Sequence, residues 1–461
     1  MTLEVEAPGG YEPERRYILD VLLGDRLGLD WRLRLGERSD VRIAAAGDST
    51  RSVVVPDVLF ATPPAEWLTA AALPARPLPW REVSEHDRGR LPVLYGSDSP
   101  GPLILPGPGG VELTVDVFGG AFFMLSRYEE RVVPARDRYG RFAAASSIAH
   151  AEGFLGLPIV DAYVEVLWSA LQRLWPGLVR RPPQFRIALS HDVDQPLASV
   201  GRNALVLLRQ LGADALVRRD AGLAVRRVRS WAGLRRSDHR LDPYNTFEFL
   251  MDVSERHATA SAFYFLATEE STPLEGLYTL EQPWIRALMR TIHERGHEIG
   301  LHGSFHSYTD PRRTEAEYLR LRRTAEREGV TQERWGGRQH YLRWENPVTW
   351  SNWEAAGLDY DSTLGYADRI GFRAGTSYEF APFHLLDRRP LELRERPLQV
   401  MDGTLFEYMK LRPDSAFERV VTIARECRRY GGTLSLLWHN NSLPTGRQKR
   451  WYEELASALF V

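Results

Sequence analysis

Hydrophobic and polar positions follow two different patterns along the chain. From residue 183 onward, short apolar runs of strand length alternate with stretches in which apolar residues recur every three to four positions. The apolar runs cover residues 185–190, 261–267, 297–303, 358–365, 397–403 and 433–441, and the helical stretches cover 245–257, 280–295, 314–328, 347–356, 415–430 and 448–459. This alternation predicts an α/β fold with a mainly parallel sheet or a (β/α) barrel.

The first part of the chain has a less regular pattern, which predicts a smaller α+β domain. Apolar and polar residues alternate over 113–117, as in a half-buried strand, and residues 161–174 have helical spacing. Because 461 residues exceed one ordinary hydrophobic core, two or three domains are expected. The best linker is the pair Pro182 and Pro183, which predicts domains at 1–182 and 183–461.

Composition narrows the class of protein. A hydrophobic content of 43% and a net charge of -2 are those of a globular protein and do not favour a nucleic-acid partner. Cys427 is the only cysteine, which excludes an internal disulfide and a cysteine-rich metal site. Neither a signal peptide nor an apolar run of membrane-spanning length is visible, so a cytoplasmic protein is expected.

Charged residues cluster in two other places. Ten arginines lie within 202–240, which predicts a basic helical insertion at about 197–242 with a solvated face. Contact of this segment with an anionic membrane is the less favoured alternative. Arg127, Glu129 and Glu130 are expected to be exposed charges at the end of a helix.

Polar side chains follow several of the predicted strands directly. They are Asp192, Asp194, His302, His306, Arg338, Asp361 and His439. In a (β/α) barrel the C-terminal ends of the strands converge on one face, where active sites are built. Two histidines four residues apart, together with a carboxylate, are a candidate metal site. Singly, the histidines could be surface or core residues and the aspartates could belong to turns or helix caps.

The segments that carry these residues match a family as a set. HDVD at 191–194, HGSFH at 302–306, GGRQHY at 336–341, YDSTLG at 360–365 and LSLLWH at 434–439 occur in this order. The set resembles the motifs of the polysaccharide deacetylases, also called NodB-homology or carbohydrate esterase family four proteins. The resemblance covers about residues 184–440. His340 stands where the family usually has a proline, two residues after the arginine.

The resemblance implies a distorted (β/α) barrel that holds a divalent metal, with zinc expected. Asp194, His302 and His306 would be the metal ligands. The implied activity is the removal of an N-acetyl or O-acetyl group from a sugar or polysaccharide precursor by metal-activated water. Two alternatives stay open, namely a hydrolase of a non-sugar linear or cyclic amide on the same scaffold, and a non-catalytic sugar-binding protein.

The resemblance also implies roles for the remaining polar residues. Asp192 would be the catalytic base, and Arg338 would orient its carboxylate. His439 would be the general acid that protonates the leaving amine, with Asp361 as its partner.

Overall fold

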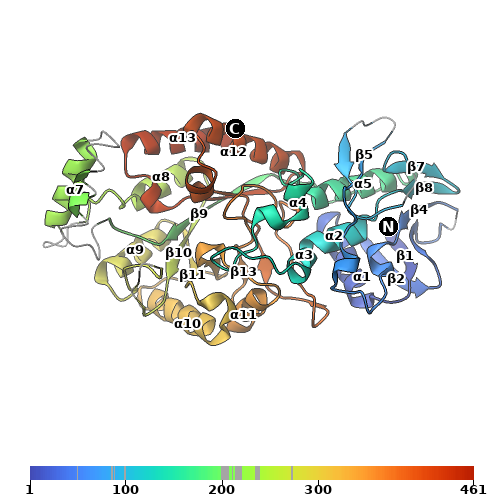
Figure 1. Ribbon diagram of the computed structural model, residues 1–461, viewed down its shortest axis with the longest axis horizontal. Coiled ribbons are helices and arrows are strands. Elements are labelled where there is room, and N and C mark those ends of the chain that lie inside the picture. The colour runs from blue at the N-terminus through green and yellow to red at the C-terminus, as the bar shows by residue number, and fades with distance from the viewer. Residues whose placement is uncertain are drawn as a thin grey trace.

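The computed structural model describes residues 1–461 apart from 49, 85, 86, 88, 98, 99, 199–206, 210, 213–220, 234–238, 271, 273 and 461. The molecule is elongated, and its two large sheets lie toward opposite ends of the long axis (Figure 1). The boundary expected at residues 182 and 183 falls between these sheets. The two-domain division itself stays a prediction.

The N-terminal sheet has six strands in the order β2-β1-β3-β4-β8-β7 and mixes parallel and antiparallel pairs. Its strands are β1 (Thr2–Pro8), β2 (Asp30–Gly36), β3 (Asp40–Ala45), β4 (Ser52–Pro56), β7 (Ile104–Gly107) and β8 (Gly110–Leu113). A separate hairpin pairs β5 (Trp80–Glu82) with β6 (Arg90–Pro92). The helical elements of this part are α1 (Glu12–Leu19), the π-helix η1 (Asp20–Arg26), η2 (Leu59–Ala61), η3 (Ala70–Ala72), α2 (Val117–Leu125), α3 (Tyr128–Val132), η4 (Ala144–Ser146), α4 (Ile148–Ala151) and α5 (Ile159–Leu174).

The strand expected over 113–117 is confirmed only in part. An isolated antiparallel bridge pairs Val115 with Gly96, and helix α2 begins at Val117. Strand β8 ends at Leu113, and Asp116 caps α2 by accepting a hydrogen bond from the Gly119 amide at 2.7 Å. The other Asp116 oxygen accepts the amides of Val58 and Leu59 at 2.9 and 3.1 Å. A buried carboxylate that accepts hydrogen bonds from three backbone amides stabilises the start of this helix.

The C-terminal sheet has eight strands, all parallel, in the order β16-β13-β12-β11-β10-β9-β18-β17. They are β9 (Arg186–Val193), β10 (Ser261–Leu266), β11 (Glu298–Gly303), β12 (Gly336–Gln339), β13 (Tyr360–Asp361), β16 (Arg394–Glu395), β17 (Val400–Met401) and β18 (Thr433–Leu437). Strands β16 and β17 form the two edges, so the sheet is an open, barrel-like layer. The predicted α/β class with a parallel sheet is confirmed.

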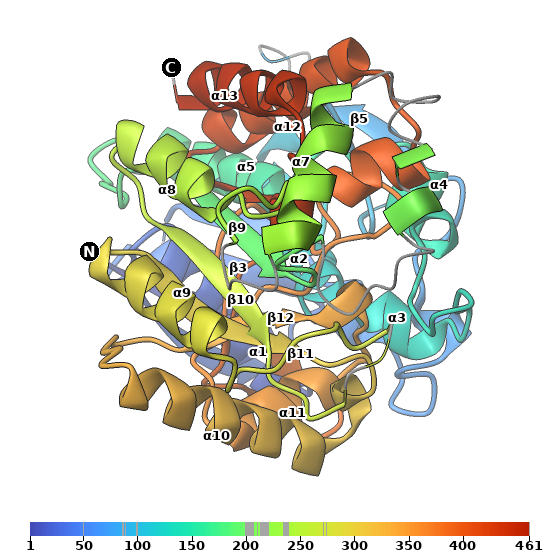
Figure 2. The same cartoon turned by 90° about the vertical axis from the view of Figure 1, so that its left-hand side faces the viewer.

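Helices surround the parallel sheet. In Figure 2, α13, α8, α9 and α10 follow one another around strands β9 to β11. The helices of this part are α7 (Ala221–Gly233), α8 (Phe247–Arg256), α9 (Pro283–Glu294), α10 (Pro311–Arg327), α11 (Val348–Ala356), α12 (Pro413–Arg429) and α13 (Gly446–Phe460). The short elements are η6 (Ser307–Thr309), η7 (His340–Leu342), η8 (Thr404–Tyr408), η9 (Asn440–Ser442) and the hairpin of β14 (Phe383–His384) and β15 (Arg389–Pro390).

Nearly half of the predicted basic insertion lies outside the described residues. Within it the structure describes helix α7, which agrees with the helical character expected there. The membrane contact expected as an alternative for 202–240 stays untested. In the described part of the chain, no helix combines the length and the apolar character needed to cross a membrane.

A buried carboxylate of α5 joins the N-terminal part to the C-terminal part. Asp161 accepts hydrogen bonds from Thr376 Oγ1 and Ser377 Oγ, both at 2.6 Å, and from the Ser377 amide at 2.9 Å. Arg26 Nη1 lies 2.6 Å from the same carboxylate, and the Asp161 side chain is fully buried. The loop at 376–377 is thereby fixed against a helix more than 200 residues earlier in the chain.

Replacing Asp161 by alanine is expected to lower the free energy of unfolding by about 3–5 kcal/mol, because a buried cation and two hydroxyls lose their partner. Urea denaturation followed by fluorescence measures the loss. Glu165→Ala on the same helix is the matched control. Glu165 pairs with Arg180 at 2.6 Å, but its side chain is 36% exposed, so its loss is expected to stay below about 1 kcal/mol. An equal loss of unfolding free energy in the two variants would contradict the conclusion that Asp161 joins the two parts of the chain.

Candidate metal centre

The buried carboxylate of Asp192, next to the end of β9, is held by the guanidinium group of Arg338 in β12. Arg338 Nη1 donates to Asp192 Oδ1 at 2.7 Å, and both side chains are almost completely buried. Further donors of Arg338 bind Ser190 Oγ, Ser362 Oγ and the Ser362 carbonyl oxygen at 2.8–3.0 Å. Burial opposes the charge of Arg338, but Asp192 outweighs burial and raises the pKa of the guanidinium. The second carboxylate oxygen, Oδ2, lies 3.8 Å from His302 Nε2.

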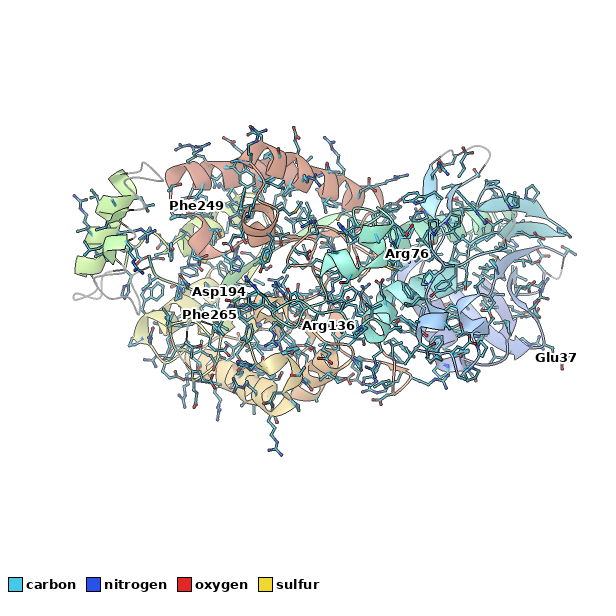
Figure 3. All side chains as sticks on the ribbon, in the orientation of Figure 1. Glu37, Arg76, Arg136, Asp194, Phe249 and Phe265 are labelled. Carbon is cyan, nitrogen blue, oxygen red and sulfur yellow. The ribbon has the colours of Figure 1, made fainter. Side chains whose placement is uncertain are left out.

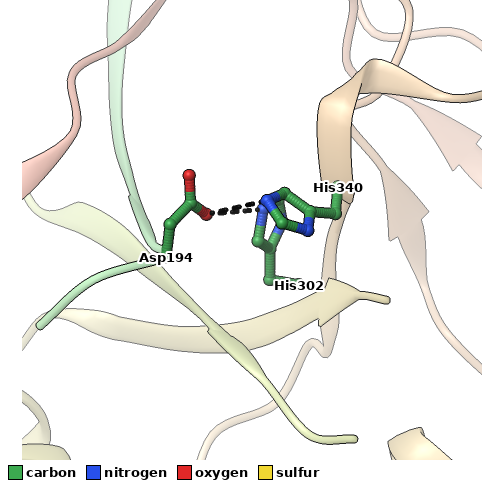
Figure 4. Close-up of side chains that lie close together, drawn as sticks. All are labelled: Asp194, His302 and His340. Carbon is green, nitrogen blue, oxygen red and sulfur yellow. Dashed lines mark ion pairs between the residues drawn. The ribbon is translucent and has the colours of Figure 1, made fainter. Parts of the chain in front are cut away.

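Asp194, His302 and His340 form a compact group at the C-terminal ends of β9, β11 and β12 (Figure 4). Asp194 Oδ1 lies 3.1 Å from His302 Nε2 and 3.5 Å from His340 Nε2. Ligand atoms of a tetrahedral zinc ion with bonds of about 2.0–2.1 Å are about 3.3 Å apart. The spacing of the group therefore fits the ligand set of one metal ion.

The hydrogen bonds of the group also fit a metal. His302 Nδ1 donates to the Arg338 carbonyl oxygen at 2.9 Å, so Nε2 carries the lone pair that a metal needs. Among the described residues, neither His302 Nε2 nor Asp194 Oδ1 has a hydrogen-bond partner, although both atoms are buried. Burial favours the neutral acid, yet His340, His302 and His439 hold the pKa of Asp194 well below its ordinary value. Asp194 is therefore an anionic ligand ready for a divalent cation.

The structure does not bring His306 into this group. Strand β11 ends at Gly303, and the chain then turns, with the Phe305 amide donating to Glu275 Oε2 at 2.7 Å. His306 precedes the short helix η6 and is exposed. Two histidines four residues apart face one point on a helix, but not where an extended strand passes into a turn.

His340 takes the position expected for His306 because of strand pairing. Strands β11 and β12 are parallel neighbours with His302 opposite Arg338, so His340 lies just past the same edge of the sheet. The sequence contained one sign of this, since His340 replaces the proline that is usual in the resembling family. His340, and not His306, is therefore the second histidine of the candidate metal group.

His439, beyond the end of β18, pairs with Asp402 instead of the expected Asp361. His439 Nδ1 lies 2.6 Å from Asp402 Oδ1, and the His439 amide donates to Asp402 Oδ2 at 3.0 Å. Burial disfavours the imidazolium ion, but Asp402 and the carboxylates of Asp194 and Asp192 outweigh burial and raise the pKa of His439 to about 10. His439 Nε2 lies 3.5 Å from Asp194 Oδ2, so the imidazole reaches the metal group.

Asp361 cannot pair with His439, because β13 lies near one edge of the parallel sheet and β18 lies near the other edge. Four strands separate β13 from β18 in the sheet, whereas β17, which leads into Asp402, pairs directly with β18. Asp361 accepts hydrogen bonds from Thr363 and lies opposite Glu395 of β16. Burial raises the pKa of Asp361 to about 7. The apolar run at 397–403 contained Asp402, but nothing in the sequence linked it to His439.

The metal group opens into a cleft of about 280 Å³. Asp192, Asp194, His302, His340 and His439 all line it, together with Tyr341. One wall comes from the N-terminal part of the chain, through Arg141. A volume of this order accommodates a small group such as an acylated amine.

One protein family matches the N-terminal part of the chain. Residues 3–176 match a protein family described as a family of unknown function, DUF7033. No curated protein matches the sequence.

Solved structures resemble about 60% of the chain at low sequence identity. A Mycobacterium smegmatis protein described as a polysaccharide deacetylase is 17% identical, with a TM-score of 0.40 over 61% of this chain and 85% of that chain. The Puue allantoinase is 12% identical, with a TM-score of 0.36 over 61% and 85% of the two chains. A mutant of a CE4 family pseudoenzyme is 9% identical, with a TM-score of 0.32 over 60% and 63%.

Alanine variants separate the two possible ligand sets. The purified protein is expected to hold about one divalent metal ion per chain, and His340→Ala should lose it because one of three ligands is gone. His306→Ala should keep full metal content, since its imidazole is exposed and outside the group. Inductively coupled plasma mass spectrometry of the three proteins gives the answer. Metal loss in His306→Ala with full retention in His340→Ala would restore the ligand set expected from the sequence.

Proposed function

We propose that the protein is a metal-dependent hydrolase that removes an N-acetyl group from an amino sugar or its derivative. The observation that carries the proposal is that three groups meet in one cleft. These are a carboxylate fixed by a buried arginine, an Asp-His-His set with metal-ligand spacing, and a histidine paired with its own carboxylate. The same machinery would act on an O-acetyl group. Zinc is the metal that suits two imidazoles and a carboxylate.

A divalent ion held by Asp194, His302 and His340 would polarise the acyl carbonyl and acidify a water molecule. Asp192 is placed to take the proton of that water. Its Oδ1 atom is occupied by Arg338, so the proton goes to Oδ2.

His439 is placed to deliver a proton to the leaving nitrogen. Asp402 binds Nδ1 and fixes the ring, so Nε2 is the nitrogen that faces Asp194 and the cleft. Attack of water on the acyl carbon and cleavage of the C–N bond would release acetate and an amine that takes the His439 proton. Asp402 stabilises the imidazolium form before the transfer, as the aspartate of a catalytic triad does.

Tyr341 and Tyr408 are the aromatic side chains that line the cleft. A sugar ring can pack against such rings. The tryptophans near the site, Trp344, Trp350 and Trp438, are buried in the hydrophobic core and do not line it. Substrate contacts are therefore expected from the two tyrosines.

Acetate release from a panel of N-acetylated and O-acetylated sugars, with zinc-loaded protein, tests the proposal. A linear and a cyclic amide without a sugar belong in the same panel, because they represent the alternative substrate class. Asp192→Asn is expected to keep the metal and to lose turnover by about 10²–10⁴-fold, since the base is removed but the ligands remain. Asp194→Asn is the comparison and should lose both metal and activity. Hydrolysis of the cyclic amide alone, or no hydrolysis by a fully metal-loaded protein, would refute the deacetylase assignment.

The role of His439 is tested by changing the leaving group. An acetamide needs a proton on its nitrogen, whereas an activated aryl acetate has a leaving group that departs without one. His439→Ala is therefore expected to lose about 10²–10⁴-fold in kcat/KM on the acetamide and far less on the aryl ester.

Asp402→Asn provides the second variant for this test. It should reduce acetamide turnover in the same direction, with metal content unchanged, because the imidazole keeps its place but loses the stabilised charge. An equal loss on amide and ester in both variants would assign His439 to substrate positioning.

A further inference from the structure

A loop of the N-terminal part reaches the candidate site. Arg141 Nη1 donates to the Tyr341 carbonyl oxygen at 3.0 Å, and Nη2 donates to Tyr408 Oη at 3.2 Å. Asp137, in the same loop, holds Arg141 Nε at 2.9 Å. Arg136 marks the course of this loop in Figure 3, where it lies between Asp194 and the N-terminal sheet along the long axis. Part of the cleft wall therefore comes from the part of the chain that matches the family of unknown function.

A second cleft, of about 780 Å³, shares Tyr408 with the first. Tyr408 lines both clefts, and its hydroxyl is fixed by Arg141. The N-terminal part contributes His150 of α4 to the second cleft, and the C-terminal part contributes Arg369 and Arg419 of α12. In Figure 1, α4 lies where the two parts of the ribbon meet.

The second cleft is lined by positive and apolar side chains. Its lining contains Arg369, Arg419 and His150 but no carboxylate among the described residues. Arg369 Nη1 donates to the backbone carbonyl of Asp368 at 2.7 Å, and the Asp368 carboxylate accepts the Ala144 amide at 3.1 Å. Neither of these hydrogen bonds pairs the guanidinium group of Arg369 with a carboxylate that lines the cleft. Two guanidinium groups at one cleft favour a phosphate or a carboxylate.

We propose that this second cleft binds an anionic group of the substrate whose acyl group occupies the first cleft. The inference rests on the proposed function and narrows its substrate class to acylated amino sugars that carry a phosphate or a carboxylate. It also gives the N-terminal part a role, since His150 and Arg141 complete the two clefts. Tyr408 lies between the acyl group and the anion.

The test compares an N-acetylated amino sugar with its phosphate and with the matching amino-uronic acid. Wild-type protein is expected to favour an anionic member of the set at low ionic strength, and salt should weaken that preference. The double variant Arg369→Glu with Arg419→Glu should lose about ten-fold or more in kcat/KM on the favoured anion, because charged hydrogen bonds are removed. The neutral sugar should keep its kcat/KM.

The matched control is Arg312→Glu with Arg425→Glu, which changes the net charge equally at two exposed residues outside the cleft. It should leave the preference for the anion intact. A preference for the phosphate over the uronic acid, or the reverse, identifies the anion and supports the proposal either way. Equal kcat/KM on neutral and anionic sugars in the wild-type protein would overturn it.

Calorimetric binding of the non-acetylated amino sugar phosphate provides a readout without turnover. Binding that depends on Arg369 and Arg419, in a protein that hydrolyses none of the sugars, would support the anion site and refute the proposed hydrolase. Sugar phosphate binding that the double variant retains in full would refute the anion site whatever the activity.

Discussion

The candidate site depends on one buried ion pair, between Asp192 and Arg338. Burial of two charges is costly, and it is offset only where every donor and acceptor is bound. Arg338 meets this condition through Ser190, Ser362 and Asp192, which belong to β9 and to the segment after β13. Its own carbonyl oxygen also fixes the His302 ring. Asp192 and His302, the proposed base and one proposed metal ligand, are therefore positioned by the side chain and the backbone of the same residue, and a change in strand β12 would move both.

Burial of charge also joins the two parts of the chain. Glu130 accepts two hydrogen bonds from Arg373, at 2.6 and 2.9 Å, and one from Arg127 at 2.9 Å. Burial favours the neutral acid, but the two guanidinium groups outweigh it and lower the pKa of Glu130. The expectation that Arg127, Glu129 and Glu130 are exposed is wrong, since all three are buried. Arg373 lies 243 residues after Glu130 in the chain, so the local sequence around Glu130 could not reveal this contact.

Strand ends could be predicted from the sequence, but strand neighbours could not. The apolar runs located β9, β10, β11 and β18. Of the polar residues predicted to meet at strand ends, Asp192, Asp194, His302 and His439 line one cleft and Arg338 binds Asp192, whereas His306 and Asp361 are not in its lining. The order of the strands decides which residues meet at the edge. His340 reaches His302 because β12 pairs with β11, and Asp402 reaches His439 because β17 pairs with β18. The spacing of His302 and His306 suggested that their two imidazoles lie together. The end of β11 and the turn after it keep them apart.

Two carboxylates separated by one residue differ in their surroundings, and their proposed roles follow from that difference. Asp192 belongs to β9 and is buried, with one oxygen bound to a guanidinium group. Asp194 lies just beyond the strand, where the imidazoles of His302, His340 and His439 all lie within 3.5 Å of its oxygens. A guanidinium group only donates hydrogen bonds and does not bind a metal, whereas imidazole nitrogens bind metals well. A cation at this site would therefore be held by Asp194, His302 and His340, and Asp192 would keep a free oxygen for a proton. The sequence motif placed the two acids close together, and the different strands that surround each of them are the reason why we propose one as a ligand and the other as a base.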